Sequence, residues 1–341
     1  MAKQRIGILS GSFDPVHHLS LRKGLEMLDR NEADQLLVIL SADPAAFADA
    51  EDRWKMLVAA CAGDKRILPS RLMLDRGTDE LSEGLMKKLR KKYPDAVFAV
   101  IPSEKEDRFS SEARSSLASA QMPDLLDIPV REYCRCKGLY GMPGRLDRID
   151  PWMDRLFSAL RPKRYAHSLS VAWTSVRLAA FHGADTLRAE QAGLLHDCAK
   201  HLPLQEMQRI AKEAALTDDQ TILENPSLLH SVVGAWVAEH EYGMTDPEVL
   251  EAIAYHNTGC AGMSRLAMCV CLADSIEPLR TPYPLLEQVR ELSGRSLERA
   301  LLLSLEGTAA YVKSHGWFLH PRTEETISWL RTLPATQDEH I

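Results

Sequence analysis

Two kinds of hydrophobic pattern divide the chain. In the first part, short apolar runs alternate with longer stretches in which apolar residues recur every three or four positions. The short runs predict buried strands and the longer stretches predict helices. The predicted strands are 5–10, 35–40 and 97–101, and the predicted helices are 19–29, 51–62 and 80–92. Strands that alternate with helices indicate a parallel sheet covered by helices.

The pattern changes near residue 140. Residues 141–144 (GMPG) are a cluster that breaks helices and strands, and Asp150-Pro151 follows. From there to residue 331 the periodicity is helical and no alternating strand pattern occurs. We therefore expect an α/β domain over residues 1–145 and an all-α domain over residues 150–335.

Charge and cysteine content narrow the class of protein. The formal net charge is −7, whereas a domain that grips a nucleic acid polymer usually carries a basic excess, so we expect no such partner. The seven cysteines lack the regular spacing of a disulfide framework, which favours reduced thiols and a cytoplasmic protein. No stretch approaches the roughly 18 apolar residues of a membrane span, so we expect no membrane partner.

Four of the twelve histidines, with two aspartates, stand where the helical pattern of the second half turns inward. His256, for example, shares a stripe with Val249, Ala252 and Ile253. A single inward histidine is more often a hydrogen-bonded core residue than a ligand, but several in one domain weaken that explanation. The six residues are His167, His196, Asp197, His230, His256 and Asp274.

These six side chains suit a metal centre. An unpaired carboxylate in an apolar interior is costly, and cations placed among imidazoles and carboxylates remove that cost. Such ligands suit iron, manganese or zinc rather than a soft thiolate metal. Six ligands exceed the needs of one tetrahedral site that keeps a water, so we expect two metal ions with Asp197 as the bridge.

The motifs around these residues resemble the YqeK family of HD-domain proteins, the symmetrical diadenosine tetraphosphate hydrolases. The likeness covers residues 160–335 and follows the strings RYAHSLSVA, AGLLHDCAKHL, LLHSVVGAWV, AIAYHNTGCAGMS and LADSIEPLR. The HD residues alone would imply only a metal phosphohydrolase, and the HNTG, GMS and ADSIEP strings point to this family. The resemblance implies an all-α HD-type fold, a di-iron centre and cleavage of a dinucleoside polyphosphate into two nucleoside diphosphates.

The same strings contain candidate substrate-binding residues. A water activated by two metal ions, bridged by Asp197, would attack a central phosphorus of the tetraphosphate. Lys200 follows His196 by four residues, and we expect it to contact phosphate, with Arg280 as a second candidate. Asn257 and Thr258 either hydrogen-bond the substrate or only close their helix. The expected partner is a small dinucleoside polyphosphate, and the sequence leaves a homodimer open.

The first half resembles the nicotinate-nucleotide adenylyltransferases. Residues 11–15 (GSFDP) and His17 match the turn and the first histidine of that family's His-x-Gly-His signature, which holds ATP phosphates at a helix N-terminus. Residues 110–114 (SSEAR) resemble the second phosphate motif. The resemblance implies a Rossmann-like nucleotidyltransferase-type domain, with His17, Ser111 and Arg114 as candidate nucleotide-binding residues.

The first half also departs from that family. Leu19 stands where the signature has its glycine, and Ser20 stands where it has the second histidine. A leucine side chain obstructs the close approach that a glycine permits. The stretch between Ile101 and Ser110 is also too short for the elements usually found there. We therefore expect a degenerate domain without adenylyl transfer, which either supports the hydrolase as a scaffold or binds a nucleotide.

Three other functions stay open at this point. The first is that of another HD nucleotide phosphohydrolase. The second is that of a bifunctional protein that also transfers adenylyl groups, and the third is that of a nucleotide sensor in which the metals are structural. Products other than two ADP would favour the first function. Pyrophosphate release from ATP and a pyridine mononucleotide would favour the second, and binding without turnover would favour the third.

Overall fold

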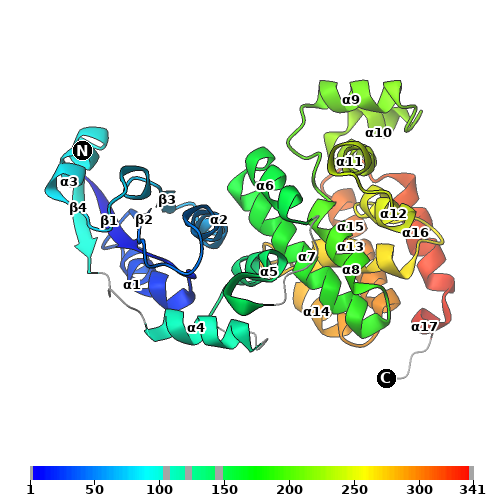
Figure 1. Ribbon diagram of the computed structural model, residues 1–341. Coiled ribbons are helices and arrows are strands. Elements are labelled where there is room, and N and C mark those ends of the chain that lie inside the picture. Colours follow the sequence, from blue (N-terminus) through cyan, green and yellow to red (C-terminus); the bar gives the residue numbers. More distant parts are fainter. Residues whose placement is uncertain (1–2, 103–107, 120–124, 143–148, 338–341) are drawn as a thin grey trace. The chain divides into compact units, whose positions relative to one another are not determined.

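The computed structural model describes residues 3–102, 108–119, 125–142 and 149–337. The chain divides into two compact units, Met1–Pro151 and Trp152–Ile341, each described here by itself. Figure 1 shows strands only in the part of the chain coloured blue to cyan, and helices throughout the part coloured green to red. This arrangement confirms the predicted fold class, an α/β part followed by an all-α part.

Four parallel strands form the sheet of the first unit, in the order β3-β2-β1-β4. They are β1 (Gln4–Gly11), β2 (Gln35–Leu40), β3 (Ile67–Ser70) and β4 (Ala96–Ile101). In the register, Ile8 of the central strand β1 lies opposite Leu37 of β2 and Val100 of β4. The sequence did not predict β3, which has only four residues, one of them Pro69. A proline is tolerated there because β3 is an edge strand.

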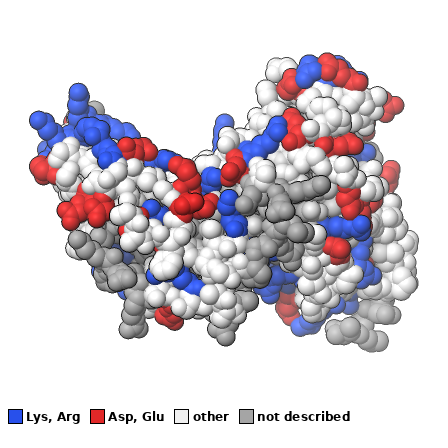
Figure 2. Space-filling model, in the orientation of Figure 1, with Lys and Arg blue, Asp and Glu red and all other residues white. Residues whose placement is uncertain are grey.

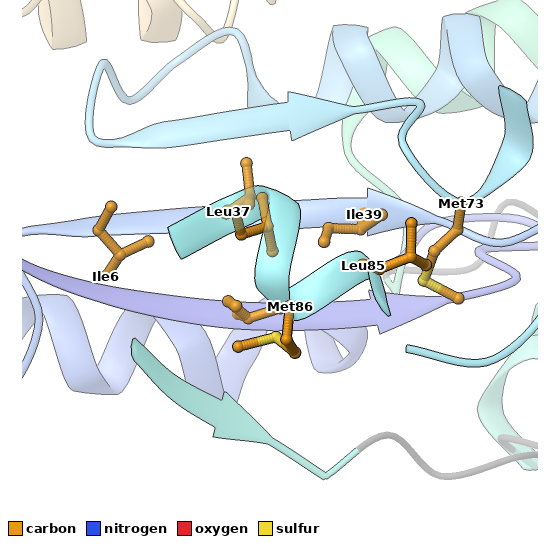
Figure 3. Packing of buried hydrophobic residues seen from close by; sticks show 8 residues of the cluster. Ile6, Leu37, Ile39, Met73, Leu85 and Met86 are labelled. Atoms are coloured by element: carbon orange, nitrogen blue, oxygen red, sulfur yellow. The ribbon is translucent and has the colours of Figure 1, made fainter. Parts of the chain in front are cut away.

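Helices cover both faces of this sheet. Their bounds are α1 (His18–Asp29), α2 (Ala50–Cys61), α3 (Glu83–Lys92), α4 (Arg108–Ala118) and α5 (Ile128–Lys137), with short 3₁₀ turns η1 (Leu74–Arg76) and η2 (Leu139–Gly141). Figure 3 shows Leu85 and Met86 of α3 packed against Leu37 and Ile39. Leu36 points to the opposite face. A β-carbon added to Gly24 of α1 would lie 2.4 Å from the Leu36 side chain, so α1 packs closely on that face.

The surface of the first unit is basic over α3. Figure 2 shows Lys and Arg side chains crowded where Figure 1 places this helix. All five basic residues of α3 are exposed to solvent, which is typical of a solvated helix face. They are Lys87, Lys88, Arg90, Lys91 and Lys92.

The second unit is helical. Its helices are α6 (Ile149–Ala159), α7 (Pro162–His182), α8 (Thr186–Leu195), α9 (Leu204–Glu213), α10 (Gln220–Glu224), α11 (Pro226–Tyr242), α12 (Pro247–Tyr255), α13 (Arg265–Ile276), α14 (Leu286–Ser293), α15 (Leu297–Ser314), α16 (Pro321–Thr332) and α17 (Pro334–Gln337). Helix α7 packs against α8 and α13, and α12 packs against α8, α11 and α13. Among the described residues, no helix combines the length and apolar character that a membrane crossing requires.

Close contact between α7 and α8 depends on a glycine. A β-carbon added to Gly193 of α8 would lie 2.8 Å from the Cα atom of Ala172 in α7 and 2.9 Å from the Ser175 hydroxyl. Real side chains do not approach backbone so closely, so the two helix axes are held near each other only because residue 193 has no side chain. This packing brings the end of α8 beside the first turns of α7.

Candidate metal centre

The six predicted metal ligands come from five different helices or the turns that follow them, and the structure brings them together. His167 lies on α7, His230 on α11 and Asp274 on α13. His196 and Asp197 follow the last residue of α8, and His256 follows the last residue of α12. His196 and His256 keep helical backbone angles, so each extends the inward stripe of its helix by one position.

The ligand atoms form two groups that share Asp197. In one group, Nε2 of His196 lies 3.5 Å and Nε2 of His167 lies 3.9 Å from Asp197 Oδ2. In the other, Nε2 of His230 lies 3.2 Å and Nε2 of His256 lies 3.8 Å from Asp197 Oδ1. The two oxygens of one carboxylate thus face different histidine pairs.

Asp274 completes the first group. Its Oδ1 atom lies 3.0 Å from Nε2 of His167 and 4.0 Å from Nε2 of His196. Ligand atoms that surround one ion at about 2.1 Å are separated by roughly 3 to 4 Å, which these distances match. The first group offers four ligand atoms and the second offers three.

Every one of the four histidines uses its Nδ1 nitrogen elsewhere. Three of these nitrogens lie close to backbone carbonyls: His196 to Gly193 (2.7 Å), His256 to Ile253 (2.8 Å) and His230 to Pro226 (3.3 Å). Nδ1 of His167 lies 3.0 Å from the buried carboxylate of Glu277. Since a carbonyl or carboxylate oxygen only accepts, Nδ1 of His167, His196 and His256 carries the proton, and Nε2 is left as the metal-facing nitrogen. Nδ1 of His230 also lies 3.1 Å from Lys200 Nζ, and its Nε2 faces Asp197.

The Nε2 nitrogens also lie close to one another. The distance is 3.3 Å between His167 and His196 and 3.2 Å between His230 and His256. If both Nδ1 nitrogens of a pair hold their protons, two lone pairs face each other at Nε2, and a bound cation satisfies both. The donor set therefore fits divalent metal ions, as the sequence predicted for these residues.

The electrostatic environment favours charged carboxylates. Burial by itself would raise the pKa of Asp197, but attraction and hydrogen bonds to His196 and His230 hold it well below its usual range. Burial also opposes ionisation of Asp274, yet its hydrogen bond to His167 lowers the pKa of that carboxyl. Both carboxyl groups are therefore ionised at neutral pH, as metal ligands must be.

The histidines respond to the same environment in two ways. Burial lowers the pKa of His230, and burial together with its neighbours His196 and His230 lowers the pKa of His256 to about 3. Burial would lower the pKa of His167 as well, but its hydrogen bonds to Asp274 and Glu277 raise it to about 9. His230 and His256 are thus neutral at pH 7, whereas a metal ion must displace a proton from His167.

Three cations border the centre. Lys200 Nζ lies 3.9 Å from Asp197 Oδ1 and 3.1 Å from both ring nitrogens of His230, and burial lowers its pKa. Arg280 lies 3.4 Å from Asp274. Arg164, which the sequence analysis did not single out, lies 2.5 Å from Asp197 Oδ2. Arg164 precedes His167 by three residues, and this one-turn spacing was its only signal in the sequence.

Asn257 and Thr258, two predicted substrate contacts, hydrogen-bond within the protein. The Asn257 amide donates to the Ser227 carbonyl at the start of α11. The buried Thr258 hydroxyl donates to the Gly259 carbonyl, 2.9 Å away. Both contacts fix the turn that carries His256. Their predicted role in substrate binding stays a prediction.

The first unit contains a cavity of about 520 Å³ at the carboxyl ends of its strands. It is lined by Gly11 at the end of β1, by the next residue Ser12, by Leu19 at the start of α1 and by Ser110 and Arg114 of α4. Its position agrees with the general rule that ligands of open parallel sheets bind outside the carboxyl ends of the strands. The six candidate metal ligands lie in the other unit.

The three predicted nucleotide-binding residues of the first unit differ from one another in burial and in contacts. His17 is buried, and its Nδ1 atom accepts the Ser20 amide and so caps α1. Arg114 is directed to Asp14 and stacks over the Phe47 ring at 4.4 Å. Ser111 is exposed, whereas its neighbour Ser110 lines the cavity and lies 3.2 Å from Nε2 of His17.

Comparisons with known proteins agree with this geometry. The family model for the HD domain matches residues 164–279, a range that contains all six candidate ligands. A symmetrical bis(5'-nucleosyl)-tetraphosphatase of Bacillus subtilis is 38% identical over 175 residues, which cover 50% of this chain and 91% of that protein.

Two further proteins extend the comparison. The crystal structure of a predicted HD superfamily hydrolase involved in NAD metabolism, from Clostridium acetobutylicum, is 37% identical, with a TM-score of 0.52. It covers 55% of this chain and 98% of that chain. A probable nicotinate-nucleotide adenylyltransferase/Ap4A hydrolase of Mycoplasma genitalium is 26% identical and covers 91% of this chain and 99% of that protein. The last likeness therefore includes the first unit.

Proposed function

The chain belongs to the HD-domain family of symmetrical bis(5'-nucleosyl)-tetraphosphatases, and we propose that it hydrolyses diadenosine tetraphosphate into two ADP at a centre of two metal ions. The observation that carries this proposal is the placement of the two carboxylate oxygens of Asp197. Its two oxygens face two different pairs of histidine Nε2 atoms, within 3.2 to 3.9 Å. A carboxylate with this arrangement suits a bridge between two ions.

The proposed ligands are His167, His196 and Asp274 on one side, His230 and His256 on the other, and Asp197 between them. Bound divalent ions would supply hydroxide from water near neutral pH and offset charge on the phosphoryl oxygens. We propose iron because the family resemblance implies it. The imidazole and carboxylate ligands also accept manganese or zinc.

The chain's own residues would orient the substrate. Lys200 and Arg280 border the centre on different elements, so they are placed to contact different phosphates of a polyphosphate chain. Positive groups aimed at developing charge in a water-poor site stabilise the transition state. A symmetrical cut then requires the two central phosphates to lie near the metal sites, with one further phosphate and its adenosine extending to each side.

We propose that the first unit binds a nucleotide without transferring adenylyl groups. The cavity at the carboxyl ends of its strands supports binding. Two backbone N–H groups at the start of α1, which would otherwise hold phosphate, already donate: His18 to the Leu125 carbonyl and Ser20 to His17. Leu19 lines the same cavity where the adenylyltransferase signature has glycine.

We also propose that the two domains are 1–145 and 150–335.

The test of the main proposal is product analysis. The full chain, incubated with diadenosine tetraphosphate and Fe²⁺ or Mn²⁺, should release only ADP. Asp197→Ala should reduce turnover to the background rate, and Asp218→Ala, which changes an exposed aspartate of the same unit, should not. ATP with AMP, or no product at all, would contradict the proposal. With ATP and nicotinate mononucleotide, the same protein should release no pyrophosphate.

The seven cysteines are free, and six of them are buried. Free thiols agree with a reducing compartment. A cytoplasmic location, and a homodimer, remain predictions.

A further inference from the structure

Arg164 occupies an unusual position at the candidate metal centre. It lies on the first turn of α7, one turn before His167, and its Nη1 atom lies 2.5 Å from Asp197 Oδ2. The Arg164 side chain is 38% exposed, whereas that of Asp197 is only 3% exposed. The guanidinium therefore reaches from the solvent side onto the buried carboxylate.

Asp197 Oδ2 has two competing uses. The same oxygen that pairs with Arg164 also faces Nε2 of His167 and of His196. A divalent ion among these three atoms would neutralise the carboxylate and repel the guanidinium, because like charges in a poorly solvated site interact strongly. Among the described residues, Asp197 is the only hydrogen-bond partner of the Arg164 side chain. Metal binding would thus leave a partly exposed guanidinium at the rim with free N–H groups.

We propose that Arg164 binds a phosphate group of the substrate, beside the ions that Asp197 holds. A guanidinium presents a planar fork of N–H donors that matches two phosphate oxygens, which a single ammonium group does not. Arg164 enters from α7, whereas Arg280 follows α13 and Lys200 follows α8. The three cations therefore surround the centre from separate elements and suit a ligand with several negative charges.

A purely structural role for Arg164 makes a different prediction. If the arginine only held Asp197 in position, its removal would weaken metal binding. If it binds phosphate, its removal leaves metal binding intact or improves it, because a cation that competes for Asp197 is gone. Metal affinity and polyphosphate affinity therefore separate the two roles.

The experiment uses the full chain loaded with Mn²⁺ and inorganic tripolyphosphate as the probe, followed by titration calorimetry. Arg164→Ala should keep its manganese and bind tripolyphosphate about tenfold to a hundredfold more weakly, as expected for a lost charge-assisted hydrogen-bond pair. Arg164→Lys should regain only part of the affinity. The control is Arg177→Ala, which changes an exposed arginine near the other end of α7 and should match the wild type.

The inference rests on the proposed metal centre but not on the identity of the dinucleotide. Loss of manganese in Arg164→Ala, or unchanged tripolyphosphate binding, would overturn it. If the wild type fails to cleave diadenosine tetraphosphate but shows Arg164-dependent tripolyphosphate binding, the proposed function fails and the inference stands. If the wild type cleaves the dinucleotide and Arg164→Ala does so equally well, the inference fails alone.

Discussion

In each of the four histidines at the centre, one ring nitrogen hydrogen-bonds within the protein and the other faces the proposed metal site. Nδ1 is held by a carbonyl in three of them and by Glu277 in the fourth, and Nε2 points to the shared space. Such hydrogen bonds orient the ring and fix which nitrogen binds metal. His167 differs from the others because its partner is a charged carboxylate, and this difference has a measurable consequence.

Metal affinity should depend on pH through His167. Hydrogen bonds to Asp274 and Glu277 raise the pKa of His167 to about 9 despite its burial, so below pH 9 a metal ion must displace a proton. Mn²⁺ affinity should therefore rise between pH 7 and pH 9, by up to about tenfold per pH unit, and then level off. Competition with a Mn²⁺ indicator dye measures this. Glu277→Gln removes one of the two carboxylates and should move the rise to lower pH, whereas an affinity that is flat from pH 7 to pH 9 would contradict the account.

The sequence could predict the ligands better than the residues around them. His230 and the other ligands can be found from the sequence because a histidine or aspartate is uncommon at an inward-facing position of a helix. Arg164 and Glu277 carry no such signal, because an arginine or glutamate in a helical segment is usually exposed. Their partners are 33 and 110 residues away in the chain, and only the packing of α7 against α8 and α13 brings them into contact.

At the scale of helices, the centre depends on how closely α7 and α8 approach. Helix α7 carries His167, and α8 ends where His196 begins. Gly193 lies one turn before His196, and a β-carbon added to it would meet the backbone of Ala172. The spacing between the two histidines therefore depends on a residue that has no side chain and contacts His196 only through its backbone carbonyl.

Gly193→Ala should damage both stability and metal binding. Its β-carbon would lie 2.8 Å from backbone, which cannot move aside as a side chain does, so the helices must separate. Overpacking of this kind costs about 1 to 3 kcal/mol of unfolding free energy. Urea unfolding measures the stability and Mn²⁺ titration measures the affinity. The control Gly294→Ala adds a β-carbon at 3.5 Å from its nearest neighbour and should stay within about 0.5 kcal/mol of the wild type. A tolerated Gly193→Ala would show that this contact does not set the centre.

Periodicity predicted the long elements and missed a short one. The expected helix 19–29 is observed as α1 (His18–Asp29), and the expected strand 35–40 is β2. The strand β3 escaped because four residues are too few to establish a period and because Pro69 favours a turn. It forms because Leu36 to Ile39 of β2 supply a partner, which is information from the tertiary structure.

At the scale of the whole molecule, two units with different chemistry share one chain. The first unit holds a cavity at the edge of a parallel sheet, and the second gathers six potential metal ligands from five helical segments. The chemistry that the proposed function needs lies entirely in the second unit. Composition alone could not show which unit carries this chemistry, because the net charge of −7 is the sum over both units and does not describe the local field at the centre.

The central claim is that Asp197 joins two metal ions, each held by histidine Nε2 atoms. Crystals of the full chain grown with Mn²⁺, measured for anomalous scattering, test it directly. The account predicts two anomalous peaks about 3.5 to 4 Å apart, one beside His167, His196 and Asp274 and the other beside His230 and His256, with an oxygen of Asp197 on each. A single peak, or peaks that Asp197 does not touch, would contradict it.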